Sequence, residues 1–292
     1  MTRVLLLGRV VLDHRFWVER FPPAANRTPT LDYVEAVGGP AAVAAETVAQ
    51  IGGEAVFIGR RGDDPAGERV ETLLRKQAVD TRHLRAVPGA RTPVAAVLID
   101  SRGDRFIFPY AGAGLPETTH WIPLRELDRA NAVLVDSRWP AGAAVLSRAA
   151  RAVGLPVVVD LDTDSPEAWA VAAAATHAIA DEELATRCGG VAAVLNRLAR
   201  ARTWGAVTLG PGGVAHAAGR MPAFPVPAHD TTGAGDVFHG AFVLAIAEHR
   251  GEDEALRRAS AAAAVRCRMG RVPTRSEVES LLAAESDTRG TQ

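Results

Sequence analysis

Apolar and polar positions follow a regular rhythm over the second half of the chain. Short apolar runs are each followed by a longer stretch in which apolar residues recur every three or four positions. The first pattern is typical of a strand buried on both faces, and the second of a helix packed on a sheet. We therefore expect strands at 132–136, 156–160, 177–180 and 206–209, and helices at 141–153, 191–202, 234–249, 253–268 and 276–284. The polar tail, 285–292, is expected to fray.

The first half continues the alternation but contains two segments of a different kind. It predicts a strand at 4–7, an alanine-rich helix at 40–51, a strand at 55–59 and a helix at 66–77 that Asp63 or Asp64 caps. Strand-like segments at about 14–36 and 91–110 interrupt this order, the second as a hairpin of 92–99 and 104–109. These two segments predict short antiparallel strands in a small separate sheet. The whole pattern favours one α/β domain over 1–292, with a parallel sheet covered by helices on both faces.

Composition excludes several classes of function. The chain has 292 residues, 48% of them hydrophobic, and a net charge of −1, so no nucleic-acid-binding surface is expected. Lys76 is the only lysine among 33 basic residues, which excludes a lysine-containing P-loop. The apolar run at 4–7 is too short for a signal peptide or a membrane span, and a cytoplasmic protein is expected. No dinucleotide-binding glycine motif follows the first strand, which disfavours a nicotinamide oxidoreductase.

The stretch from 230 to 242 carries the clearest chemistry. Gly233 and Gly235 lack a Cβ and precede a helical apolar pattern, so free backbone N–H groups at the start of that helix can approach an anion closely. Asp236 follows in the first turn and could accept a proton from an alcohol. Together these features are suited to phosphoryl transfer to a hydroxyl group. The plainer alternative is a glycine turn with Thr232 as the helix N-cap.

The full stretch, D-T-T-G-A-G-D-x-F-x-G-A-F, resembles the C-terminal signature of the ribokinase-like (PfkB) carbohydrate and nucleoside kinases. The resemblance implies a ribokinase-like three-layer α/β/α fold in which the small sheet is a lid over the substrate and a homodimer interface. It implies that Gly233, Ala234 and Gly235 hold the transferring phosphoryl group and that Asp236 is the catalytic base. It also implies ATP and Mg²⁺, with a monovalent cation as a further candidate.

Three segments resemble the sugar-binding part of the family. Asp13 lies past the end of the first strand, where the alternative is a turn residue; by resemblance it binds substrate hydroxyls. Gly38 and Gly39 begin a helix and by resemblance contact the sugar. Arg138 follows the strand at 132–136, and its guanidinium suits an anionic group, although it could equally pack on Trp139.

The combination of 37–42, 134–139 and 230–240 resembles most the sulfofructose kinase branch of the family. That resemblance implies phosphorylation of 6-deoxy-6-sulfofructose to its 1-phosphate, with Arg27 and Arg138 holding the sulfonate. Pro109 stands where that branch has an asparagine, a departure from the pattern. The alternatives are a kinase of the fructokinase, ribokinase or 2-keto-3-deoxygluconate kinase type, or a non-catalytic sugar or nucleotide sensor with the same fold.

The nucleotide would bind between the last strand and the 230–242 stretch. The segment containing Thr208, Gly210 and Gly213 resembles the family's T-x-G-x-x-G motif, which contacts ATP phosphates. Gly233 and Gly235 would contact the same phosphates, and Gly270 would allow a turn near the adenine. Glu183 matches a family glutamate that influences Mg²⁺, here through water, although Ala180 replaces the neighbouring asparagine.

Overall fold

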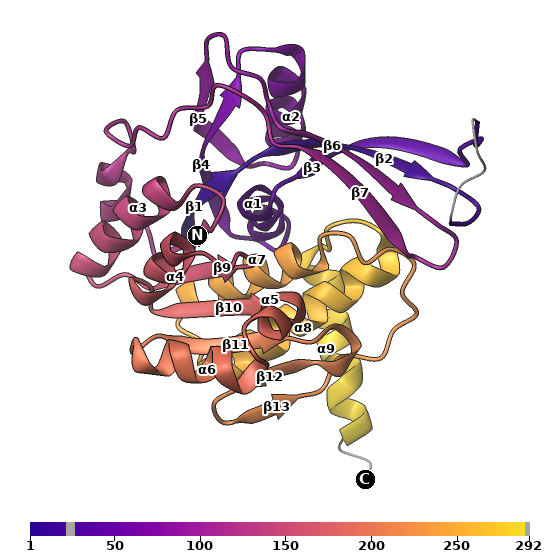
Figure 1. The fold of residues 1–292 in the computed structure, drawn as a ribbon. Coiled ribbons are helices and arrows are strands. Elements are labelled where there is room, and N and C mark those ends of the chain that lie inside the picture. The colour runs from indigo at the N-terminus through magenta and orange to yellow at the C-terminus, as the bar shows by residue number, and fades with distance from the viewer. Residues whose placement is uncertain (22–26, 290–292) are drawn as a thin grey trace.

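The computed structural model describes residues 1–21 and 27–289, with side chains to residue 285. Its main sheet has nine strands in the order β13-β12-β11-β10-β9-β8-β1-β4-β5 (Figure 1). The seven strands from β11 to β5 are parallel, and β12 and β13 run antiparallel at one edge. The strands are β1 (Arg3–Arg9), β4 (Glu54–Gly62), β5 (Asp80–Val87), β8 (Ala132–Asp136), β9 (Val157–Leu161), β10 (His177–Asp181), β11 (Trp204–Thr208), β12 (Val214–His216) and β13 (Gly219–Met221).

Helices cover both faces of this sheet. Side chains of successive strand residues point to opposite faces, so Leu6 and Leu134 pack in one core and Leu5 and Leu7 in the other. The first core is closed by α1 (Pro40–Gln50), α2 (Pro65–Lys76), α7 (Ala234–Ala247), α8 (Glu252–Met269) and α9 (Arg275–Arg289). The second is closed by α3 (Pro140–Ala152), α4 (Pro166–Ala173), α5 (Glu182–Arg187) and α6 (Val191–Arg200). The predicted three-layer architecture is confirmed.

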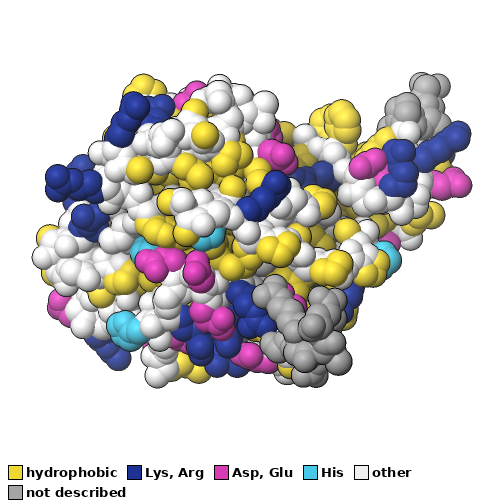
Figure 2. All heavy atoms as spheres, turned by 90° about the horizontal axis from the view of Figure 1, so that it is seen from below, with side chains coloured by type: hydrophobic (Ala, Val, Ile, Leu, Met, Phe, Trp, Pro, Cys, Tyr) yellow, Lys and Arg dark blue, Asp and Glu magenta, His cyan; other side chains and the backbone are white. Residues whose placement is uncertain are grey.

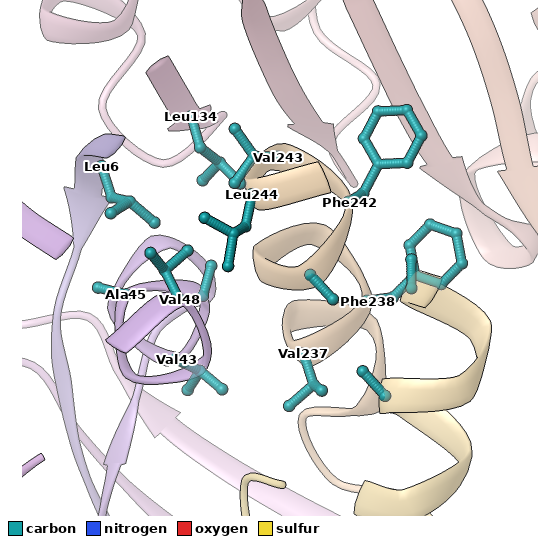
Figure 3. Packing of buried hydrophobic residues seen from close by; sticks show 14 of the residues in the cluster. Leu6, Val43, Ala45, Val48, Leu134, Val237, Phe238, Phe242, Val243 and Leu244 are labelled. Carbon is teal, nitrogen blue, oxygen red and sulfur yellow. The ribbon is translucent and has the colours of Figure 1, made fainter. Parts of the chain in front are cut away.

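The first core brings α1 and α7 into direct contact. Figure 3 shows Val48 of α1 beside Leu244 of α7, with Leu6 and Leu134 of the sheet close by. Gly240 makes this contact possible, because a Cβ there would lie 2.6 Å from the Ala44 carbonyl oxygen of α1. The beginnings of α1 and α7 therefore have a fixed relation to each other.

A second, four-stranded sheet, here called the lid sheet, projects from one end of the molecule (Figure 1). Its order is β3-β2-β6-β7, formed by β2 (Val11–Trp17), β3 (Asp32–Gly38), β6 (Val94–Ile99) and β7 (Arg105–Tyr110). The expectation of a purely antiparallel sheet was wrong, because β2 and β6 pair in parallel. Its first strand, β2, also begins at residue 11 rather than 14, so that a single residue, Val10, separates it from the end of β1.

Other boundaries agree with or extend the expected ones. The predicted helices and parallel strands are present within a few residues of their expected ends, and Asp64 rather than Asp63 caps α2 by accepting a hydrogen bond from the Gly67 amide. Helix α9 continues to residue 289, beyond the predicted helix end at 284. The sequence patterns gave no indication of β5, β12, β13, α4 or α5.

The surface shows no concentration of one charge on the face drawn in Figure 2, where Arg and acidic side chains lie interspersed. Among the described residues, no helix is both long and apolar enough to cross a bilayer.

Candidate active site

The site is built around the first turn of α7. Gly233 is the N-cap in place of the expected Thr232, and its φ of 73° is a left-handed conformation that glycine adopts without strain. The Ala234 amide donates to the Thr231 carbonyl, 3.2 Å away. The amides of Gly233, Gly235 and Asp236 have no recorded acceptor among the residues that the structure describes. Three N–H groups at a helix N-terminus are thus free to bind an anion.

A buried ion pair fixes the loop that leads into α7. The Arg266 guanidinium of α8 donates to the Asp230 carboxylate over 2.9 Å and to the Asp230 carbonyl over 3.2 Å. The other Asp230 carboxylate oxygen accepts the Thr232 amide at 2.8 Å. The lid sheet reaches the same loop, since Arg105 of β7 donates to the Thr231 hydroxyl at 2.8 Å. The loop is therefore held from the main body and from the lid.

The Asp236 carboxyl group is half-buried, and no described residue pairs with it. It lies close to the glycine turn, because a Cβ on Gly233 would be 3.7 Å from its Oδ2. The pKa of Asp236 is raised to about 7, mainly by burial and further by the charges of Asp162, Asp13 and Asp136. A carboxylate with such a pKa can exchange a proton near neutral pH.

Asp13 and the two glycines before α1 face Asp236 from the lid side. Asp13 is buried, its carboxylate lies 3.3 Å from the Arg15 guanidinium, and burial raises its pKa although Arg15 opposes the rise. A Cβ on Gly38 would lie 2.3 Å from the Asp13 carboxylate. Gly39 is the N-cap of α1 at φ 93°, where a Cβ would lie 2.3 Å from the Arg9 carbonyl oxygen. Both glycines are therefore required by close packing.

Asp136, at the end of β8, ties β1, α1 and β8 together. Its carboxylate accepts the amides of Arg9 at 2.9 Å, Ala41 at 3.3 Å and Arg138 at 3.0 Å. Burial raises its pKa to about 6, although these three donors oppose the rise. Gly8 leaves room for this carboxylate, since a Cβ there would be 2.0 Å from its Oδ2. Asp136 thus organises the floor of the site.

The Arg138 guanidinium pairs with the Asp162 carboxylate and is partly exposed. Burial alone would raise the pKa of Asp162, but the charge of Arg138 and the hydrogen bonds from Ser137, Thr163 and Arg138 together outweigh it, so the pKa is lowered and Asp162 is ionised. The suggestion that Arg138 packs on Trp139 was wrong. It is Arg60 of β4 whose guanidinium carbon lies 4.0 Å from the centre of the Trp139 ring.

The remaining predicted residues lie farther along the sheet edge or outside it. Thr208 ends β11 and donates to the Ala180 carbonyl at 3.3 Å, and Gly210 and Gly213 follow with φ of 51° and 85°. Gly270 caps α8 at φ 70°. The Glu183 carboxylate is 79% exposed and pairs with Arg187. Arg27 is exposed in the connection between β2 and β3, next to residues 22–26, which are outside the described part of the chain.

Sequence reasoning missed several groups at the same edge. Asp160 lies near the end of β9 and Asp162 directly follows it, and burial together with the charge of Asp162 raises the pKa of Asp160. His239 of α7 lies 2.7 Å from the Gly235 carbonyl oxygen through Nδ1 and 3.5 Å from the Asp160 carboxylate. Burial lowers the pKa of His239, which keeps it neutral at pH 7. The positions of the two aspartates at the end of a parallel strand were the available signal for them.

Comparison with known proteins identifies the family. A family model described as pfkB family carbohydrate kinase matches residues 1–274. The chain is a PfkB carbohydrate kinase. It therefore transfers a phosphoryl group from ATP to an alcohol group of a sugar, and the proposed sensor without catalysis is set aside.

Individual relatives cover nearly the whole kinase. It is 27% identical to the ribokinase of Bacillus subtilis over 97% of this chain and 100% of the relative. It is 30% identical to an ATP-dependent ribose-1-phosphate kinase of Halopiger xanaduensis, over 83% of this chain and 84% of the relative. A crystal structure from Agrobacterium tumefaciens, provisionally described as a ribokinase, superimposes with a TM-score of 0.92 at 34% identity, covering 98% and 99% of the two chains.

These relatives confirm the ribokinase-like fold and the kinase family but give no support for the sulfofructose kinase branch. They also leave the metal requirement open. Among the described residues, no group of three or more His, Cys, Asp or Glu side chains is arranged to hold a metal ion. Glu183, the predicted residue near Mg²⁺, is paired with Arg187.

Proposed function

We propose that Asp236 is the general base of this kinase and removes the proton from the sugar hydroxyl that attacks ATP. The supporting observation is the unpaired Asp236 carboxylate, with a pKa of about 7, beside the free amides that begin α7. Gly233, Ala234 and Gly235 line the place where the transferring phosphoryl group would carry its charge. As the hydroxyl oxygen bonds to the γ-phosphorus and the bond to ADP breaks, its proton passes to Asp236.

The two substrates would approach this turn from opposite sides. Asp13, with its buried carboxylate, and the backbone at Gly38 and Gly39 would bind sugar hydroxyls under the lid sheet. On the other side, the turn after Thr208 that contains Gly210 and Gly213 would bind ATP phosphates, and Gly270 would lie near the adenine. Mg²⁺ would arrive with ATP, with Glu183 acting through water.

The acceptor sugar is proposed at the level of a ribokinase- or fructokinase-type substrate. Among the relatives, one is named for ribose and one for ribose 1-phosphate, so both neutral and charged sugars belong in a test. Sulfofructose also belongs in that test, with Arg138 as its proposed sulfonate contact. Arg27 is exposed in the β2–β3 connection and would need a closed lid to reach the same group.

The test is ADP release over a panel of sugars with wild type and Asp236→Asn. The variant should lose about 10²–10⁴-fold in kcat, the usual contribution of a proton-transfer group, while ATP affinity changes little. Asp253→Asn is the matched control: it is the same substitution in the exposed first turn of α8, and it should keep wild-type kcat. An Asp236→Asn enzyme within tenfold of wild type would show that another group takes the proton.

We also propose that residues 1–292 act as one kinase unit that dimerises through the lid sheet. The lid sheet carries large exposed apolar side chains on β3 and β7, of which Tyr33, Phe106, Phe108 and Tyr110 share one face by the strand register, opposite to the face of Asp13 and Arg15. Every residue of β7 is exposed in the single chain. A second copy of this sheet offers a matching apolar surface.

A further inference from the structure

A cavity of about 170 Å³ lies at the carboxyl ends of β1, β4 and β8, next to the site described above. Its floor is formed by Gly8 and Arg9 of β1, and its walls by Arg60 and Arg138. The segment from Ala111 to Leu115 and Glu117 forms its roof. Three arginines and one carboxylate therefore surround a space that none of the proposed contacts to hydroxyl groups or ATP uses.

The charges of this cavity are not balanced. The Arg60 guanidinium lies 3.1 Å from the Glu117 carboxylate, which is 65% exposed, and also donates to the Pro116 carbonyl. The Arg138 guanidinium pairs with Asp162. The Arg9 guanidinium has no recorded partner among the residues the structure describes. Two of the three positive charges are matched by carboxylates, and one is not.

The unmatched charge acts on its neighbours. Burial lowers the pKa of Arg60, and the positive charge of Arg9 lowers it further, which places the two guanidinium groups within electrostatic reach of each other. Arg60 is also held from below, since it stacks over the fully buried Trp139. A bound anion would relieve this repulsion and satisfy donors that are already in place.

Residues that line the cavity contact two carboxylates near the proposed base. The Arg9 amide on its floor donates to Asp136, and Arg138 in its wall pairs with Asp162. Asp162 and Asp136 are both among the charges that raise the pKa of Asp236. The lining of the cavity therefore contacts two of the carboxylates whose charges act on Asp236.

We propose that this cavity, with Arg9, Arg60 and Arg138, binds an anionic substituent of the sugar, so that the acceptor is a tetrahedral oxyanion sugar such as a sugar phosphate or sulfonate. This inference rests on the proposed function, because it assigns the far end of the same substrate. Guanidinium groups present pairs of donors that match the oxygens of phosphate and sulfonate. Glu117 is the exposed carboxylate that such a group would displace from Arg60.

The test compares kcat/KM for matched sugars: fructose, fructose 6-phosphate and 6-deoxy-6-sulfofructose, and also ribose and ribose 5-phosphate. Wild type should prefer an anionic member of a pair by about 10²-fold or more. In Arg9→Gln the ratio of anionic to neutral kcat/KM should fall about 10- to 100-fold, as expected for a lost charge-assisted contact. In Glu117→Gln the ratio should rise, because the competing carboxylate is gone.

Arg148→Gln is the matched control, since Arg148 is exposed on α3 outside the cavity, and it should leave the ratio unchanged. A neutral sugar preferred by wild type, with equal effects of Arg9→Gln on both members of a pair, would refute the anion site and leave the kinase function intact. The sugar with the higher kcat/KM, fructose 6-phosphate or 6-deoxy-6-sulfofructose, identifies the anionic substituent as phosphate or sulfonate.

A second measurement does not depend on turnover. Inorganic phosphate and sulfate should raise the thermal midpoint of wild type more than that of Arg9→Gln, with Arg148→Gln behaving as wild type. If no sugar in the panel reacts but this Arg9-dependent shift is present, the acceptor assignment fails while the anion site stands. If the shift is equal in all three proteins, the cavity does not bind the anion.

Discussion

At the scale of single residues, the site gathers several carboxyl groups around Asp236. Asp236 forms no ion pair with a described residue and lies near three other carboxylates, Asp13, Asp136 and Asp162, whose effect the charge of Arg15 opposes only in part. Such an arrangement destabilises the ionised form, which is why the pKa of Asp236 rises to about 7. If Asp236 is the base, as proposed, its raised pKa should make activity depend on pH near neutrality.

We expect kcat/KM to rise with pH through about 7, because only ionised Asp236 can accept the hydroxyl proton and its pKa is about 7. Asp162→Asn should move this acidic limb to lower pH, since the negative charge of Asp162 raises the pKa of Asp236. Steady-state kinetics from pH 5.5 to 9 measure both effects. A limb that stays in place in Asp162→Asn would contradict this account of the charges.

Asp236→Asn should also make the protein more stable at alkaline pH. The folded state holds the Asp236 proton more tightly than the unfolded chain, so stability from this group is complete at low pH and decreases as pH rises toward 7. Asparagine does not ionise, so the variant does not lose stability as the pH rises. The thermal midpoint of the variant should exceed that of wild type by a few degrees at pH 8 and by less at pH 5, whereas Asp253→Asn should show no such difference.

Whereas ionised Asp236 destabilises the fold, the Arg266–Asp230 ion pair stabilises it. Both side chains of this pair are almost completely buried. Arg266→Ala should lower the free energy of unfolding by about 3–5 kcal/mol, because the Asp230 carboxylate would remain buried without a partner. Urea unfolding measures this, and Arg266→Met combined with Asp230→Asn should recover part of the loss. A loss below about 1 kcal/mol for Arg266→Ala would mean that the loop before α7 is held by other contacts.

At the scale of elements, the contact between α1 and α7 fixes the relative position of the proposed sugar-binding and phosphate-binding turns. Gly39 begins α1 and Gly233 begins α7, and Gly240 allows the two helices to touch. Glycine inside a helix normally costs stability relative to alanine. Here the close approach reverses that preference.

Gly240→Ala should therefore destabilise the protein by about 1–3 kcal/mol, as overpacking does, instead of stabilising it. Its Cβ would lie 2.6 Å from the Ala44 carbonyl oxygen and 2.7 Å from the Thr47 Cβ. It should also raise KM for sugar and ATP together, because the two helix starts would move apart. Gly251→Ala is the control: nothing lies within 4 Å of its Cβ, and its effect should stay within about 1 kcal/mol.

The elements also show what the sequence could and could not predict. The parallel strands β8 and β9 are continuous apolar runs, so they were evident, as was the glycine turn before α7. β5 mixes buried and exposed positions, and β12 and β13 have only three residues each. None of the three strands therefore shows a clear period of apolar residues. The parallel pairing of β2 with β6 joins segments far apart in the chain, which no local pattern reports.

In the candidate site, too, residues of contiguous motifs could be picked out from the sequence, whereas residues brought together only by folding could not. Asp236 and the turn before it belong to one contiguous motif, and Asp13 and Gly38–Gly39 each follow or precede a recognisable element. Arg9 and Arg60 carry no such signal, because they meet only when β1 and β4 pair. The stacking of Arg60 rather than Arg138 on Trp139 likewise depends on the folded arrangement.

At the scale of the whole molecule, the lid sheet is the exposed apolar feature that most needs a partner. Phe106 and Phe108 of β7 are 58% and 57% exposed. Wild type should elute as a dimer in size-exclusion chromatography with light scattering, and Phe106→Asp with Phe108→Asp should elute as a monomer, because charges would be buried in the interface. Val153→Asp, at an exposed apolar position after α3, should remain dimeric. A monomeric wild type would contradict the proposed interface.

The junction between the two sheets limits how parts of this kinase can be exchanged. Val10 alone separates β1 from β2, it is fully buried, and β3 runs directly through Gly38 and Gly39 into α1. A chimaera that takes its lid from another family member must therefore transplant 10–39 as an unbroken cassette, with 93–111 as a second one. A splice point at Val10 or at Gly38–Gly39 would place a foreign lid sheet on a main sheet with which its connecting residues do not pack.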